Sequence, residues 1–321
     1  MKPWHLKMSV QLFDAKGKLA DSGTVEEWWS SPQLDRRQYK STAYSATEIR
    51  RDGRVYRTPG ADLPPYYLAL LRWQVVHPVR KHLAYASGPK QPGGLPLVVP
   101  VLKKVTLGKI SMDCISYRSA SAKDPAVLGR NTGYCLSSEG DSLRMSLDLG
   151  GEQIFRNAIG RFQDKEVAVD SVVYANDIKA ASEHVDSLAS ALIPETEFEI
   201  SADTPEVTPP IVAEGENPEL ESVLAKSILS RGDATYPEQA KFKHLAGSVV
   251  LRGIIGTSGK IRDIQVISSS DPLFVPSAMD ALRDWKYKPI MLGGVPVEVE
   301  TTIQTIYSMG QSSAATILKE N

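Results

Sequence analysis

The first part of the chain alternates apolar and polar residues with the period of two that is typical of β-strands. His5–Leu12 alternates throughout, Asp14–Lys18 supplies turn residues, and Ser22–Trp29 follows as the return strand. Similar short segments follow within residues 36–58 and 104–174, with polar turns between them. Many short strands joined by regular turns predict an antiparallel sheet, a sandwich or a half-barrel.

One segment of this part has a helical period instead. Apolar and long side chains recur three and four residues apart between Leu63 and Val79. The pair His77-Pro78 disfavours continuation of a helix, because a residue before proline avoids helical backbone angles. We therefore expect one helix within residues 63–79 that ends near His77.

The last part of the chain combines both periods. Gly259 and Gly293-Gly294 mark turns, and Pro237 and Pro276 stand where the first turn of a helix tolerates proline. The elements predicted, in order, are a short helix after Tyr236, strands Gly247–Ile255 and Ile261–Ser268, a helix Val275–Trp285 and a long last strand Val295–Tyr307. This αββαβ order predicts a compact α+β domain.

An acidic, proline-containing segment separates these parts. Residues 194–232 hold nine acidic and two basic residues together with five prolines. This composition is typical of a stiff, extended linker, and Pro218–Ser230 adds the pattern of a short helix. We therefore predict the α+β class, with a β-rich antiparallel, half-barrel-like domain at 1–193, the linker at 194–232, the αββαβ domain at 233–310 and a tail at 311–321.

Composition adds few constraints. A chain of 321 residues is longer than a typical single domain, and 42% hydrophobic with 23% charged residues is the balance of an ordinary globular protein. The net charge of -1 creates no overall field that attracts nucleic acid or acidic lipid. No apolar run of about 18 residues predicts a membrane span, and the first residues lack a signal-peptide pattern. We expect either a cytoplasmic protein or one whose leader is missing from this sequence.

The two cysteines lie in strand-like segments joined by a short polar link. A hairpin would place Cys114 opposite Cys135, close enough for a disulfide. Two buried thiols are the alternative. A disulfide would indicate an oxidising compartment, because reducing compartments keep thiols free.

The last part resembles the TonB C-terminal domain family. Its matching motifs, in order, are Tyr236-Pro237 with Ala240, Gly247–Leu251, Gly259-Lys260-Ile261, Val266–Ser270, Ala278 with Ala281-Leu282, Trp285–Tyr287 before Lys288-Pro289, and Gly294–Val297. The resemblance implies a domain of the bacterial periplasm that is linked to energised transport through the outer membrane. In that family the last strand offers an edge to the TonB box, a short receptor segment that pairs as an extra strand.

The resemblance therefore implies a TonB-dependent outer-membrane receptor as partner. The expected peptide-binding residues are Val295, Val297, Val299, Thr301, Ile303, Tyr236 and Pro237. The alternative is that both faces of the last strand are only structural. Inner-membrane motor proteins are a further partner in the family, although the membrane helix and long spacer of a complete transducer are missing from this sequence.

The strand rhythm of the first part resembles periplasmic half-barrel proteins that handle lipoproteins, such as LolA, without a short shared motif. This resemblance implies that a concave sheet holds an acyl chain. The expected lipid-binding residues are Trp28, Trp29, Tyr39 and Trp73, with Trp4 beside them. A plain aromatic core accounts for the same residues.

The sequence contains no catalytic or metal-binding constellation. Its five histidines are scattered, Cys114 has no neighbouring base, and residues 253–259 lack the Lys-Ser/Thr ending of a phosphate loop. The basic cluster of Arg50, Arg51, Arg54 and Arg57 resembles a nucleic-acid face, but a solvated sheet face is the expected interpretation. We expect no enzymatic activity, cofactor, metal or nucleic-acid partner.

Two functions remain. The first is a periplasmic TonB-like protein that binds a receptor segment by strand addition. The second is a carrier of lipid or lipoprotein through the half-barrel, with the last domain as a docking module.

Overall fold

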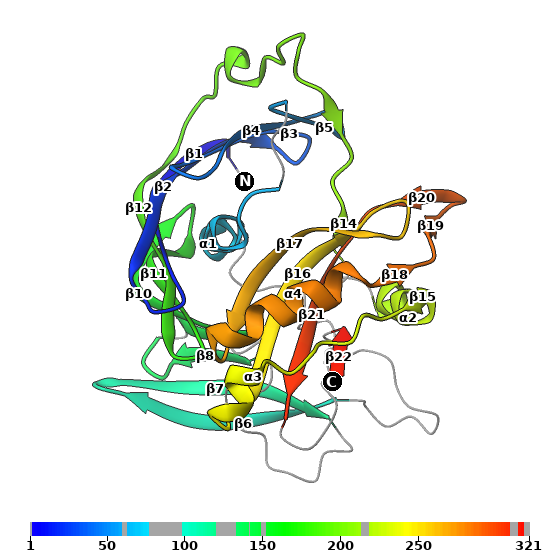
Figure 1. Cartoon of the computed structure of the whole chain (residues 1–321). Helices are drawn as coiled ribbons and strands as arrows, with labels where there is room; N and C mark the ends of the chain where they lie inside the picture. Colours follow the sequence, from blue (N-terminus) through cyan, green and yellow to red (C-terminus); the bar gives the residue numbers. More distant parts are fainter. Residues whose placement is uncertain are drawn as a thin grey trace. The chain divides into compact units, whose positions relative to one another are not determined.

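The computed structural model describes residues 2–59, 63–76, 98–119, 133–140, 142–148, 152–212, 218–308 and 314–317 (Figure 1). The chain divides into two compact units. The first contains residues 1–78, 154–174 and 178–209, and the second contains residues 79–153, 175–177 and 210–321. The units interleave along the chain, and the predicted division at residues 193 and 232 stays a prediction.

The first unit is built on a curved sheet with strand order β13-β5-β4-β3-β2-β1-β12-β11-β10 (Figure 1). The pairs from β5 to β12 in this order are antiparallel. The strands are β1 Trp4–Phe13, β2 Leu19–Ser31, β3 Leu34–Ser41, β4 Ser45–Arg51, β5 Arg54–Arg57, β10 Glu152–Phe162, β11 Lys165–Ala175, β12 Ile178–Ser190 and β13 Glu206–Val207. The predicted β-rich character of this part is confirmed.

Alternation along β1 explains which side of this sheet is buried. Trp4, Leu6, Met8 and Val10 are buried, whereas the residues between them are at least partly exposed. Helix α1 (Tyr66–Val76) lies on the concave side of the sheet and packs against β1 and β12 (Figure 1). The helix begins and ends within the range that its period predicts. Its apolar side chains complete the core of the unit.

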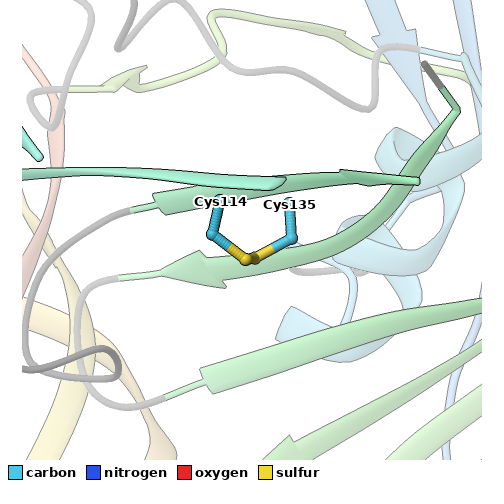
Figure 2. Close-up of a disulfide and its surroundings, with 2 residues drawn as sticks. All are labelled: Cys114 and Cys135. Carbon is cyan, nitrogen blue, oxygen red and sulfur yellow. A yellow bond between two sulfur atoms is a disulfide. The ribbon is translucent and has the colours of Figure 1, made fainter. Parts of the chain in front are cut away.

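The second unit contains a run of consecutive antiparallel strands, β6 (Val98–Leu107), β7 (Ile110–Ser119), β8 (Gly133–Ser137) and β9 (Leu143–Asp148). Cys114 of β7 stands directly opposite Cys135 of β8. The two form a disulfide, with their Cα atoms 3.9 Å apart (Figure 2). The predicted bridge is confirmed, and its strands place it in the buried face of the sheet, since both cysteines are buried.

The second unit also contains the small α+β domain. Its elements are α3 Glu238–Phe242, β16 Gly247–Ile255, β17 Ile261–Ser269, the 3₁₀ turn η3 Pro272–Phe274, α4 Val275–Arg283 and β21 Val299–Tyr307. The αββαβ order is therefore as predicted. β16 lies between β17 and β21, and the buried residues Ala278 and Leu282 of α4 join Val249 and Leu251 of β16 in one core.

The long last strand that the pattern predicts is in fact divided. β20 (Val295–Val297) pairs with β19 (Ile290–Leu292) in a separate hairpin, and β21 begins only at Val299. Glu298 lies at the break, where its carboxylate accepts a hydrogen bond from Arg262 and its carbonyl accepts one from the Ile211 amide. Alternation alone continues through Glu298, so the periodicity gives no sign of this break.

The acidic segment differs from a free linker in its first half. The 3₁₀ turn η2 (Glu195–Phe198) buries Phe198, and Arg36 binds the Glu197 carboxylate. β13 then pairs with β5 in the first unit. One aromatic residue in an acidic run is enough to anchor it, because its burial removes a large apolar area from water. The predicted short helix is present as α2 (Pro218–Ser227).

Candidate functional site

The outer side of β21 carries two short strands that do not belong to the αββαβ order. β14 (Ile211–Val212) pairs in parallel with Val299 and Glu300. β22 (Ala314–Ile317) pairs in antiparallel orientation with Ile303–Ile306. The strand edge that was expected to accept a peptide is thus paired with segments of the same chain at both of these places.

The predicted peptide-binding side chains on β21 face the core of the small domain. Val299, Thr301 and Ile303 are each at most 1% exposed. Val299 and Ile303 pack in the cluster that contains Trp285 and Phe274. An added strand would contact these residues through their backbone groups, because their side chains point away from the sheet edge and into the protein.

The other four predicted residues lie in different surroundings. Val295 is 61% exposed on the β19–β20 hairpin, and Val297 is partly buried against the core. The Tyr236 hydroxyl donates to the Leu245 carbonyl, and its ring meets Phe274 and Tyr307 edge-on. Pro237 precedes α3. The structure therefore brings Val299, Thr301 and Ile303 together on one strand but places the remaining residues elsewhere in the domain.

The opposite face of β21 is polar and ordered by ion pairs. Arg252 of β16 binds Glu300 with Nε–Oε1 and Nη2–Oε2 distances of 2.6 and 2.7 Å. Arg262 of β17 binds Glu298 in the same two-pronged way. Paired guanidinium and carboxylate groups hold a fixed geometry, so they stiffen β16, β17 and the start of β21.

A second candidate site lies in the first unit, between α1 and the concave side of the sheet. It is a cavity of about 310 Å³. Apolar side chains line most of it, and Lys165 is the charged residue among them. The lining residues are Trp4, Val75, Val76, Phe162, Gln163, Lys165, Val167 and Leu188. A volume of this size lies at the lower end of the range of small-molecule pockets.

The polar groups of this cavity are few. Gln163 is engaged, because its side chain bonds both backbone groups of Lys2 and the Ser190 hydroxyl. The Trp4 indole Nε1, although buried, has no hydrogen-bond partner within the described residues. Buried indole N–H groups usually find an acceptor, so Trp4 can donate to a polar group of a bound molecule.

Of the residues expected to contact lipid, Trp4 lines this cavity, whereas Trp28, Trp29, Tyr39 and Trp73 do not. Trp29 pairs with Trp4 across β2 and β1 and stacks on its ring with 5.9 Å between centroids, so it lies beside the cavity wall. Trp28 stands on the opposite face of β2, stacked on His5 and under the Arg36 guanidinium. Tyr39 is buried in the core of the unit, and Trp73 is 39% exposed on α1.

The sequence did not indicate the other seven lining residues, which are Val75, Val76, Phe162, Gln163, Lys165, Val167 and Leu188. The strand residues among them come from β10, β11 and β12, which are consecutive in the chain and adjacent in the sheet. Alternation along β11 was a usable signal for Val167, since it shares a face with buried Val173. No pattern within one segment reveals that Leu188 and Phe162 meet at the same opening.

Buried charges fix α1 beside this cavity. Arg72 of α1 donates to both oxygens of Glu27 on β2, with an Nε–Oε2 distance of 2.6 Å, and Arg37 of β3 contacts the same carboxylate. Burial alone would raise the pKa of Glu27, but the two guanidinium groups outweigh that cost, so the pKa lies below its usual value. On the other side of α1, Arg156 of β10 donates to Gln74.

The basic cluster on β4 and β5 is paired rather than free. Arg50 binds Asp35, Arg51 binds Glu195, Arg54 binds Glu206 and Arg57 binds Glu48. Arg57 is also only 9% exposed, so the expectation of a fully solvated face is wrong at this position. Carboxylates from β3, β4, η2 and β13 neutralise these guanidinium groups, which lie close together in the sequence.

Glu183 of β12 is buried near Ser171 and Arg156, and both its oxygens lack a hydrogen-bond partner in the described part of the chain. Burial raises the pKa of Glu183 to about 8, against smaller opposing effects of Ser171 and Arg156. The side chain is therefore neutral at neutral pH. Within the residues that the structure describes, no cluster of His, Cys, Asp and Glu has the arrangement of a metal site. None of the described helices combines the length and hydropathy of a membrane span.

The geometry defines a small α+β domain whose central strands support added strands. Residues 233–309 match the family model of the Gram-negative bacterial TonB protein C-terminal domain. The match confirms the resemblance that the ordered motifs carry for this segment. No curated protein matches the chain in sequence.

Three solved structures have a partial likeness to the chain. A LolA superfamily protein from Nitrosomonas europaea has a TM-score of 0.35 at 4% identity, over 62% of this chain and 90% of that one. A DUF1329 family protein from Desulfovibrio piger has a TM-score of 0.35 at 7% identity over the same shares. A domain of an outer membrane lipoprotein-sorting protein from Vibrio parahaemolyticus has a TM-score of 0.34 at 11% identity, over 61% and 89%. TM-scores this low do not establish a shared fold.

Proposed function

We propose that this protein works in the bacterial periplasm and binds an extended segment of an outer-membrane receptor by strand addition to β21. The observation that carries the proposal is the pairing of β21 itself. Its outer edge already supports a parallel strand at Val299–Glu300 and an antiparallel strand at Ile303–Ile306. The backbone of β21 is thus positioned to bond a further strand, and the matching family model supports a role beside outer-membrane receptors.

The receptor segment takes the place of β22 in this proposal. β22 contributes four residue pairs and lies near the end of the chain. So short a strand holds its position weakly, because few backbone hydrogen bonds offset the entropy of ordering it. The side chains of the receptor segment would lie beside Gln304 and partly exposed Ile306, on the face away from the core.

The disulfide supports the proposed compartment. Cys114 and Cys135 are bridged in a buried face of the sheet. Disulfides form and persist in the periplasm and are rare in the reducing cytosol. A periplasmic location also suits a chain that meets receptors from the inner side of the outer membrane.

Calorimetric titration with a TonB-box peptide tests the proposal. The full chain is compared with a chain ending at Ser308, which lacks β22, and with a control chain ending at Ile317, which keeps it. We expect the chain without β22 to bind severalfold more tightly than the other two, because its edge is open before the peptide arrives. A peptide with proline in its centre should bind none of them, since proline cannot donate to the ladder.

Equal affinity of all three chains would show that the peptide does not replace β22. Absence of binding by all three would contradict strand addition altogether.

The cavity in the first unit favours a second function, the carriage of a single acyl chain. Its lining is apolar apart from Gln163 and Lys165, and the Trp4 indole offers an unused donor. An ammonium beside an apolar cavity suits a fatty-acid carboxylate or an anionic lipid headgroup. Val167→Phe and Leu188→Phe should fill the cavity and lower the uptake of a fluorescent fatty acid, whereas Leu19→Phe on an exposed position should not. Unchanged uptake by the filled variants would remove this function.

A further inference from the structure

The β6–β7 hairpin combines exposed apolar side chains with lysines at its free end. Leu107 and Ile110 stand opposite each other across the turn Gly108-Lys109, and each is 44% exposed. Leu102 of β6 is 81% exposed. Large apolar side chains are costly to leave in water, so a group of them at the end of a hairpin indicates a contact surface.

Three lysines surround this apolar end. Lys103, Lys104 and Lys109 are exposed, whereas the stretch from β6 to Met112 contains no acidic residue. Asp113 is the nearest carboxylate, and it lies 3.7 Å from the Lys104 Nζ. The hairpin is therefore locally positive in a chain whose net charge is -1.

The order of these groups along the hairpin suits a lipid surface, because the apolar pair is at the tip and Lys103 and Lys104, whose flexible stems can extend toward the tip, lie behind it. Strand residues advance about 3.3 Å each, so Lys103 stands roughly 13 Å behind Leu107 on the same face of the hairpin. Apolar groups of peripheral proteins enter the headgroup zone by about 5–10 Å, with lysines at the level of the phosphates. Lys109 is exposed in the turn itself, where a flexible stem lets its ammonium reach the level of the phosphates.

Protection of a sheet edge explains only part of this pattern. β6 is the last strand in its sheet, and lysines and Pro100 discourage pairing with another chain there. Protection of the edge does not require exposed Leu107 and Ile110, because exposed apolar side chains favour association with other molecules. The lysines and the apolar pair together fit one occupant, a negatively charged bilayer surface. We propose that the β6–β7 hairpin docks the protein on anionic phospholipid, with Leu107 and Ile110 entering the headgroup zone.

Vesicle sedimentation of the full chain tests this docking, with phosphatidylcholine vesicles that contain or lack phosphatidylglycerol. The wild-type protein should bind the anionic vesicles and lose this binding in high salt. The variant Lys103→Gln/Lys104→Gln/Lys109→Gln should weaken binding roughly fivefold per lysine. The variant Leu107→Ser/Ile110→Ser should also weaken it. All five positions are exposed, so folding should be unaffected.

A second hairpin supplies the matched control. β19–β20 exposes Leu292 and Val295 to 62% and 61%, also opposite each other across a two-residue turn, but it carries no lysine between Ile290 and Val297. Leu292→Ser/Val295→Ser should leave vesicle binding unchanged. Tryptophan fluorescence reports insertion: emission from Leu107→Trp should gain a blue-shifted component with anionic vesicles, and Leu292→Trp should not.

Equal binding to both vesicle types, equal losses in both serine variants, or no binding by the wild-type protein would overturn the proposal. Binding to a soluble acidic protein in place of vesicles would overturn it as well, because it would assign the lysines to a protein partner.

Discussion

At the scale of single residues, two buried groups determine how the protein responds to its surroundings. The carboxyl group of Glu183 is buried without a hydrogen-bond partner in the described residues, and its pKa is raised to about 8. The disulfide between Cys114 and Cys135 crosslinks neighbouring strands. One group links stability to pH and the other links it to redox conditions.

The substitution Glu183→Gln should remove part of the pH dependence of stability. The unfolded chain loses this proton near the ordinary pKa of 4.5, whereas the folded protein holds it until about pH 8. The contribution of Glu183 to stability is therefore fully present below pH 4.5. As the pH rises from there toward 8, the unfolding free energy falls by up to about 1.4 kcal/mol per pH unit. Urea unfolding gives the unfolding free energy of both proteins between pH 5 and 8. The difference between the two values, plotted against pH, measures this slope.

An exposed carboxylate provides the control. Glu166→Gln on β11 should leave the slope unchanged. If the difference in unfolding free energy between wild type and Glu183→Gln stayed constant from pH 5 to 8, it would contradict the raised pKa of Glu183.

Loss of the disulfide should destabilise the second unit. The bridge links residues 21 positions apart. Closing a loop of this length restricts the unfolded chain and contributes about 3 kcal/mol. Cys114→Ser/Cys135→Ser should therefore lower the unfolding free energy by this amount in urea, and reductant should destabilise the wild type but not the variant. Equal stability of the two oxidised proteins would contradict a structural role.

At the scale of elements, helix α1 is joined to the sheet by the buried pair of Arg72 and Glu27. Glu27→Leu should cost about 3–5 kcal/mol, because it leaves the Arg72 charge buried and unpaired. Adding Arg72→Met should recover part of this loss. A double-mutant cycle of unfolding free energies measures the coupling, and strictly additive effects would show that the pair does not anchor the helix.

The sequence predicts most elements of the fold but not the short ones. The αββαβ order was predictable because its strands and α4 are long enough to show a period, and Pro237 marks the start of the short helix α3. β14 and β22 have two and four residues, too few for any period, and β14 also pairs with a strand far away in sequence. The break at Glu298 was equally hidden, since the alternation runs through it.

The candidate sites likewise include features that the sequence predicts and features that it does not. The disulfide was predictable, because a hairpin with two cysteines in its strands has few alternatives. Trp28 and Trp29 are adjacent in one strand, so they necessarily face opposite sides and cannot line one pocket together. The cavity requires four strands, β1, β10, β11 and β12, to meet α1, and such a meeting is a property of the tertiary fold.

At the scale of the whole molecule, the chain combines two units with different candidate roles. The second holds the domain that matches the TonB C-terminal family at residues 233–309, and the first holds the apolar cavity. The central claim is that a receptor segment adds to β21 and replaces β22. This claim concerns the backbone of a single strand, so it is open to direct observation.

Backbone amide shifts of the full, isotope-labelled chain during titration with a TonB-box peptide provide that observation. The account predicts large shifts at Ile303–Ile306, the residues that pair with β22, and smaller ones at Val299–Glu300. Signals of β22 should move at the same time toward those of an unpaired segment. Unchanged β21 signals at a peptide concentration that saturates the binding isotherm would contradict strand addition at this edge.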